Sequence, residues 1–192
     1  MREHKVSVDD HGWLNGVARI ESPNYDCRPA RVDPTLVVVH GISLPAGHFG
    51  GDEIHQLFTN TLQPNALIAA EVASLRVSAH ALIRRDAQVV QYVSFRDRAW
   101  HAGVSEFDGQ ERCNDFSIGI ELEGTDHIPY EPAQYAALAA IFHALQTRWP
   151  ALRPERVVGH SDIAPGRKTD PGPAFRWETF YGALNAWPPR AD

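Results

Sequence analysis

The sequence predicts an α/β protein of the α+β kind, in which a central mixed β-sheet is flanked by helices. The run Leu36–His40 (LVVVH) is continuously apolar, which is typical of a central strand buried on both faces. Residues 132–149 begin with a proline and carry apolar side chains at helical spacing, so we expect a core-packed helix there. Strand patterns are separated by loops and helices along the chain, and this order favours a mixed sheet with helices packed against it.

The other predicted elements are shorter. The strand predicted at Ser117–Glu123 alternates, so that Ile118, Ile120 and Leu122 face the core while Glu121 lies on the polar face. On that polar face Gly119 leaves room for a substrate or a metal. The remaining expectations are an irregular lead-in (1–34), a glycine-rich loop (41–51), a short helix (about 52–58), a long connection (59–75), two paired strands (77–83 and 89–93) and a last helix (about 173–184).

Length and composition indicate one globular domain over residues 1–192. A chain of 192 residues with 43% hydrophobic residues is long enough to bury a sizeable core. The formal net charge of -6 argues against a nucleic-acid partner. No apolar stretch resembles a signal peptide or a membrane span, so we expect a cytoplasmic monomer. Cys27 and Cys113 form no C-x-x-C pair and are predicted to be free thiols, with a lone disulfide as the alternative.

Two histidines and one aspartate are candidate metal ligands. His40 ends the apolar strand, and His160 and Asp170 bracket the downstream loop HSDIAPGRKTD. A catalytic zinc typically takes three such protein ligands and leaves its fourth position to water. Spacing alone does not decide the matter, because the chain has ten histidines. Asp162 is an alternative ligand, although a cap of the turn that follows it is the better interpretation. Lys168, one of two lysines, could meet a developing oxyanion as a point charge.

Five segments carry a family resemblance that extends over nearly the whole chain. In this order they resemble the zinc-dependent N-acetylmuramyl-L-alanine amidases, and most of all the cytoplasmic members that act on 1,6-anhydro-muramyl peptides in cell-wall recycling. The resemblance implies a fold shared with phage T7-type lysozymes and peptidoglycan recognition proteins. The segments are VVVHGISLPAGHFGG (37–51), LRVSAHALIRRD (75–86), RAWHAGVS (98–105), ERCNDFSIGIELEGTD (111–126) and GHSDIAPGRKTDPGPAF (159–175).

The resemblance also implies roles for individual residues. His40, His160 and Asp170 would hold one catalytic Zn²⁺, Glu121 would be the general base and Lys168 would stabilise the oxyanion. The implied reaction is hydrolysis of the amide between the lactyl group of the anhydro sugar and L-alanine, with a small muropeptide as the only partner and no membrane involved.

Substrate contacts are expected at five further positions. Arg76 and Arg112 match family positions that contact substrate, and each suits a carboxylate, with a surface ion pair as the alternative. Trp100 is expected to wall the pocket, and His101 either shapes a loop or contacts substrate. Gly41 stands where members of this type often have asparagine, which removes a side-chain amide that could bind substrate.

The other histidines are expected to have structural roles. His80 is expected to be a hydrogen-bonded core residue; surface or packing roles are expected for His4, His11, His48, His55, His127 and His143. The competing functions are a muropeptide sensor without activity, a zinc peptidase that cuts within the stem peptide, and an exported or phage-type amidase that acts on intact peptidoglycan.

Overall fold

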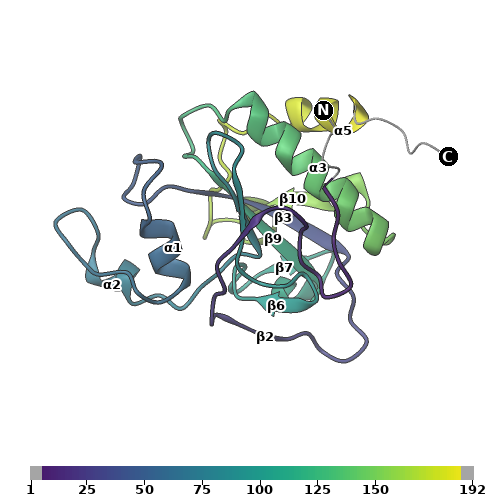
Figure 1. Cartoon of the computed structure of the whole chain (residues 1–192), viewed down its shortest axis with the longest axis horizontal. Coiled ribbons are helices and arrows are strands. Elements are labelled where there is room, and N and C mark those ends of the chain that lie inside the picture. The colour runs from purple at the N-terminus through teal and green to yellow at the C-terminus, as the bar shows by residue number, and fades with distance from the viewer. Residues whose placement is uncertain (1–5, 187–192) are drawn as a thin grey trace.

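A six-stranded mixed sheet forms the centre of the protein in the computed structural model, which describes residues 6–186 (Figure 1). Strands β4, β9, β3 and β10 are parallel neighbours, β5 runs antiparallel to β4, and β1 is parallel to β5. The predicted mixed sheet is therefore confirmed. In sheet order the strands are β1 (Ala18–Arg19), β5 (Val89–Gln91), β4 (Ala81–Ile83), β9 (Ser117–Glu123), β3 (Leu36–Ile42) and β10 (Val157–Gly159).

Helices cover the two faces of this sheet. The long helix α3 (Pro132–Arg148) packs on the face that presents Ile118, Ile120 and Leu122, and α5 (Trp177–Ala186) lies beside α3 (Figure 1). The opposite face meets α1 (Glu53–Phe58), while α2 (Ala70–Ala73) lies nearby. The alternation predicted for the strand at 117–123 is thus confirmed, because its apolar side chains enter the core under α3.

The remaining elements are short. Strand β2 (Tyr25–Cys27) pairs with β6 (Asp97–Ala99), and β7 (Glu106–Phe107) forms a hairpin with β8 (Gln110–Glu111). The chain enters β9 through η1 (Cys113–Asp115), enters β10 through η2 (Pro154–Arg156), and leaves β10 directly into α4 (His160–Ile163).

Several boundaries differ from the sequence prediction. The paired strands expected at 77–83 and 89–93 are only three residues each, because the chain bends at His80, whose N–H donates to the Gly119 carbonyl. The lead-in is not wholly irregular, since it contributes β1 and β2, and the long connection 59–75 contains α2. The last helix starts at Trp177 rather than near residue 173.

The sheet topology sets the position of the site. Strands β3, β9 and β10 are parallel, so their carboxyl ends lie at the same edge. Register places His40 opposite Glu121 across β3 and β9, and His160 directly follows β10. Three of the predicted site residues therefore meet at one edge of the sheet.

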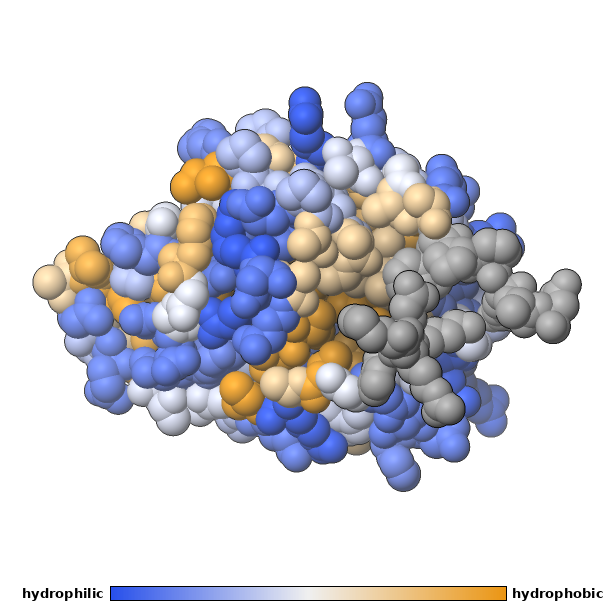
Figure 2. Space-filling model, turned by 45° about the horizontal axis from the view of Figure 1, so that its top comes forward, coloured by the Kyte–Doolittle hydropathy of each residue, from blue (hydrophilic) through white to orange (hydrophobic). Residues whose placement is uncertain are grey.

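Figure 2 shows one face that is largely hydrophilic, with an apolar area near its middle. Among residues 6–186 no helix combines the length and the apolar character that a membrane span needs. Both cysteines are free thiols, Cys27 exposed and Cys113 buried, as predicted.

Candidate metal and catalytic site

Three candidate ligand atoms converge at the carboxyl edge of the sheet. His40 Nδ1 lies 2.9 Å from His160 Nδ1 and 3.2 Å from Asp170 Oδ2, and His160 Nδ1 lies 3.1 Å from the same oxygen. Ligand atoms at roughly 2.0 to 2.2 Å from a tetrahedral zinc would be about 3.3 to 3.6 Å apart. Two imidazoles and one carboxylate are a ligand set typical of such an ion. This cluster of described residues can therefore hold a metal with little adjustment.

Each histidine of the cluster has a partner on its other ring nitrogen. His40 Nε2 lies 2.9 Å from His101 Nδ1, and His101 Nε2 lies 3.1 Å from the Ser117 hydroxyl. His160 Nε2 lies 3.1 Å from the carbonyl oxygen of Ala102. A ligand bound through Nδ1 keeps its proton on Nε2, so both partners act as acceptors and orient the rings.

The protonation states of two candidate ligands, His40 and Asp170, suit a cation. Burial is the largest influence on His40 and lowers its pKa to about 4, so this imidazole is neutral at pH 7. Burial also acts to raise the pKa of Asp170, but contacts with His160 and His40 outweigh it and hold this pKa below its usual range. Neutral imidazoles and an ionised carboxylate are the protonation states that bind metals.

Asp162, the alternative ligand, does not join the cluster. Its side chain is exposed, and Oδ2 accepts a hydrogen bond of 2.7 Å from the Gly159 N–H at the start of α4. The capping role expected from the sequence is thus observed, although the cap closes the turn before Asp162 rather than the one after it.

Glu121 lies beside the cluster with a carboxylate oxygen that has no partner. Its Oε2 is buried and accepts no hydrogen bond. Burial, and next the charge of Asp170, raise the pKa of Glu121 well above its ordinary value, while Lys168 acts to lower it. A buried, unpartnered carboxylate with a raised pKa is suited to accept a proton as a general base.

Lys168 approaches the same point from the loop between α4 and Asp170. Its side chain is exposed, yet its charge acts on both His40 and Glu121. Its backbone N–H donates to the Ala164 carbonyl, which holds the loop against α4. The ammonium is therefore free to meet a ligand at the edge of the metal cluster.

The predicted space at Gly119 is occupied by the protein itself. A Cβ atom on Gly119 would lie 2.4 to 2.7 Å from ring atoms of His101. The expectation that this glycine makes room for substrate or metal is therefore wrong, because the imidazole that supports His40 fills the space. Of the two roles expected for His101, the contacts favour the one that shapes the site.

Gly41 is also closed to a side chain. A Cβ atom there would lie 2.2 Å from the hydroxyl oxygen of Tyr130. That hydroxyl donates to the Pro171 carbonyl, next to the candidate ligand Asp170, at 3.0 Å. Tyr130 is not among the residues predicted for the site, because it lies between a strand and a helix, where no motif marks it.

The candidate substrate residues lie at the surface. Arg76 is exposed and donates to the carbonyls of Ser74 and Leu75 in its own loop, at 3.1 and 3.2 Å. Arg112 is exposed, adopts a left-handed backbone (φ 62°) and pairs with Asp115 at 3.3 Å. Trp100 is half-buried. The two guanidinium groups are thus accessible to a ligand, while no contact of Trp100 with the cluster is observed.

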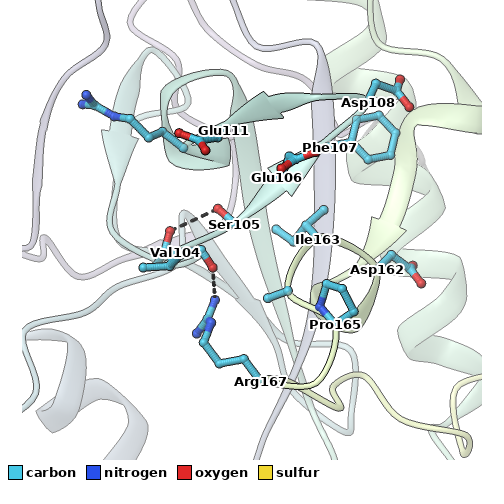
Figure 3. Close-up of a pocket in the computed structure, with 13 residues that line it drawn as sticks. Val104, Ser105, Glu106, Phe107, Asp108, Glu111, Asp162, Ile163, Pro165 and Arg167 are labelled. Carbon is cyan, nitrogen blue, oxygen red and sulfur yellow. Dashed lines mark hydrogen bonds between the residues drawn. The ribbon is translucent and has the colours of Figure 1, made fainter.

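A pocket of about 990 Å³ lies between the loop 103–112 and the segment 162–167 (Figure 3). Phe107, Ile163 and Pro165 give it an apolar side, and Val104, which is 87% exposed, also lines it. Arg112 adds a cation to the lining, alongside the carboxylates of Glu106, Asp108, Glu111 and Asp162.

Arg167 joins this pocket to the metal cluster. Its guanidinium donates to the carbonyls of Ala102 and Val104, each at 2.6 Å. Figure 3 draws the bond to Val104. The Ala102 carbonyl is also the partner of the candidate ligand His160. The Ala102 carbonyl therefore links the pocket to the candidate metal site. No motif in the sequence marks Arg167 for this place.

The predicted structural histidines behave largely as expected. His80 is fully buried: Nδ1 accepts from the Gly119 N–H at 3.0 Å, and Nε2 donates to the Asp97 carbonyl at 3.1 Å. His55 packs on Tyr92 and lies 2.5 Å from Arg84. His11, His48 and His127 are exposed, His143 is half-buried, and His4 lies outside the described residues.

Comparisons of the sequence with known proteins point to one family. The profile of the N-acetylmuramoyl-L-alanine amidase family matches residues 30–173. The 1,6-anhydro-N-acetylmuramyl-L-alanine amidase AmpD of Citrobacter freundii is 60% identical over 172 residues, which cover 89% of this chain and 91% of that protein.

Solved structures give the same result. A crystal structure of a selenomethionine derivative of AmpD matches with a TM-score of 0.88 and 58% identity, and the match covers 92% of this chain and 98% of the other. The amidase AmiD of E. coli, in complex with anhydro-N-acetylmuramic acid-L-Ala-D-gamma-Glu-L-Lys, matches with a TM-score of 0.59 and 29% identity, covering 94% of this chain and 66% of AmiD.

Proposed function

Because the chain belongs to the N-acetylmuramoyl-L-alanine amidase family, we propose that it hydrolyses the amide between the lactyl group of 1,6-anhydro-N-acetylmuramic acid and L-alanine in small muropeptides. The observation that carries this proposal is the cluster of His40, His160 and Asp170, with the unpartnered Oε2 of Glu121 beside it. Similarity to AmpD over 89% of the chain supports the anhydro sugar as the preferred end of the substrate.

The metal in this proposal is one Zn²⁺ held by His40, His160 and Asp170. Bound there, zinc lowers the pKa of a water molecule and polarises the carbonyl of the scissile amide. The ligand atoms lie 2.9 to 3.2 Å apart and need little movement to surround such an ion. His101 and the Ala102 carbonyl orient the two imidazoles from behind.

The chain's own side chains move the proton and stabilise the developing charge. Glu121 takes a proton from the attacking water and passes it to the nitrogen of the leaving L-alanine. Its raised pKa suits both halves of this transfer. Lys168 places its ammonium beside the oxyanion that forms from the amide carbonyl. The products are the anhydro sugar acid and the free stem peptide.

Substrate recognition is assigned to the surface beside the metal cluster. Arg112 lines the pocket that Arg167 and the Ala102 carbonyl link to His160, and we place a carboxylate of the stem peptide against its guanidinium. Arg76 is exposed and available for a second carboxylate. Trp100 is assigned to the sugar side, where an aromatic face can pack against a ring.

In the cell we place this reaction in peptidoglycan recycling. The proposal comprises one domain over residues 1–192, a monomeric state and a cytoplasmic location, with no nucleic-acid partner. The net charge of -6 and the small size of the substrate support these assignments.

The decisive experiment is mass spectrometry of the zinc-loaded protein with 1,6-anhydro-N-acetylmuramyl-tripeptide. We expect release of anhydro-muramic acid and intact tripeptide, loss of this release on chelation and its return with zinc. Cleavage within the peptide would instead indicate a peptidase, and binding without cleavage a sensor. Faster release from purified sacculi than from the soluble muropeptide would indicate an amidase of intact peptidoglycan.

A further inference from the structure

We infer that Tyr130 is a positioning residue for the metal ligand Asp170, and that position 41 is a glycine because the Tyr130 hydroxyl takes the space of a side chain there. The inference deepens the proposed function, since it rests on Asp170 as a zinc ligand. It assigns a role to two residues outside the ligand set, the general base and the oxyanion lysine.

The place of Tyr130 is fixed by packing on every side. Its side chain is buried, with only 5% of the residue exposed. The ring contacts Phe175 and Tyr135 edge-on, with centroids 5.4 and 6.5 Å apart. Gly124 of the chain after β9 lies directly beneath it, since a Cβ there would be 2.2 Å from the ring. The hydroxyl is therefore held at one point over the ends of β3 and β9.

At that point the hydroxyl holds the backbone next to Asp170. Tyr130 Oη donates to the Pro171 carbonyl at 3.0 Å. On the other side, the Asp170 carbonyl accepts from the Ser161 N–H at 2.9 Å. Residues 170 and 171 are thus tied both to α4, which carries His160, and to Tyr130. With its backbone held on both sides, Asp170 presents Oδ2 within 3.2 Å of both histidine nitrogens.

The fit between Tyr130 and Gly41 depends on one atom. A Cβ at position 41 would lie 2.2 Å from the Tyr130 hydroxyl oxygen but 3.5 Å from the ring carbon Cζ that carries it. The first distance is a severe overlap, whereas the second is ordinary van der Waals contact. A methyl group at position 41 must therefore displace the hydroxyl from Pro171, but it fits without strain once the hydroxyl is gone.

The test is zinc affinity, measured by competition with a chromophoric chelator on metal-stripped protein. Tyr130→Phe keeps the ring and removes only the hydrogen bond. We expect zinc to bind about 10-fold more weakly, the lower end of the range for a lost outer partner of a metal ligand. The matched control is Tyr135→Phe, which loses a hydrogen bond of 2.8 Å from the Arg176 N–H in the same aromatic cluster. The control should bind zinc like the parent protein.

A double-mutant cycle separates positioning from general destabilisation. Gly41→Ala alone should weaken zinc binding about as much as Tyr130→Phe, since both break the same hydrogen bond. In the Tyr130→Phe background, Gly41→Ala should have no further effect. Independent effects that multiply in the double variant would overturn the inference, as would parent-like affinity of Tyr130→Phe or equal loss in Tyr135→Phe.

Failure of this inference can be distinguished from failure of the proposed function. A parent protein that binds zinc and cleaves muropeptide, but whose Tyr130→Phe variant binds zinc equally well, would refute this inference alone. A parent protein that binds no zinc would refute both the inference and the metal of the proposed reaction.

Discussion

At the scale of single residues, Glu121 illustrates the conflict between function and stability. Its buried oxygen has no partner, and burial raises its pKa, so the ionised form is less stable in the folded protein than in the unfolded chain. The stability that the protonated form of such a group contributes is fully present below its unfolded pKa, and it is lost as the pH rises from that value through the folded pKa.

Glu121→Gln is therefore expected to separate the two properties. We predict that kcat/KM falls by about 10² to 10⁴-fold, the usual contribution of a general base. At pH 7 the variant should be at least as stable as the parent in urea unfolding, and it should keep its zinc. Near-parent turnover would remove Glu121 from the mechanism.

Lys168 supplies a pH-dependent prediction. The charge of Lys168 acts to lower the pKa of Glu121, so its removal raises that pKa further. In Lys168→Met we expect a lower kcat/KM and an acidic limb of the pH profile displaced to higher pH, because the base becomes protonated earlier as the pH falls. Lys168→Arg keeps the charge and should keep the parent limb. An unmoved limb in Lys168→Met would show that the ammonium does not act on Glu121.

At the scale of elements, the four-residue helix α4 contains both a candidate metal ligand, His160, and a residue that caps the start of the helix, Asp162. Asp162 caps the start of α4 at Gly159, while His160 points into the metal cluster. We predict that Asp162→Ala lowers the free energy of unfolding by about 1 kcal/mol, as for other lost caps, without loss of zinc. Asp170→Ala should lose zinc outright. Metal analysis and urea unfolding of both variants would check this, and equal zinc loss in Asp162→Ala would contradict the ligand choice.

Elements with a long repeating pattern were predictable, and short ones were not. The helix at 132–148 and the strands at 36–42 and 117–123 carry enough residues to show their periods. Strand β10 and helix α4 have three and four residues, too few for a pattern to appear. Their structure comes from contacts with β3 and with the loop before Asp170.

At the scale of the whole molecule, the residues that converge at the site were predictable, but their supports were not. His40, His160 and Asp170 stand at ends of elements or in a loop with a recognisable pattern. His101 and Tyr130 act by filling the space above Gly119 and Gly41, and each pair is distant along the chain. Such packing depends on the folded arrangement, so no local pattern of the sequence indicates it.

The assembly of the site from distant segments leads to a prediction about the stability of the whole protein. His40 is separated from His160 by 120 positions and from Asp170 by 130. A metal that binds all three binds only the folded chain, so it stabilises the protein by mass action. At free zinc about 100 times its Kd, the gain is about 2.7 kcal/mol.

For a chain of this length, such a gain corresponds to a rise in Tm of roughly 5 to 11 °C. Thermal unfolding with zinc and with excess chelator would measure it, and His160→Ala should show no difference between the two conditions. The rise should shrink as the pH falls, because protons compete with zinc for the histidine ligands. A parent protein whose Tm is the same with zinc and with chelator would contradict a metal that joins these segments.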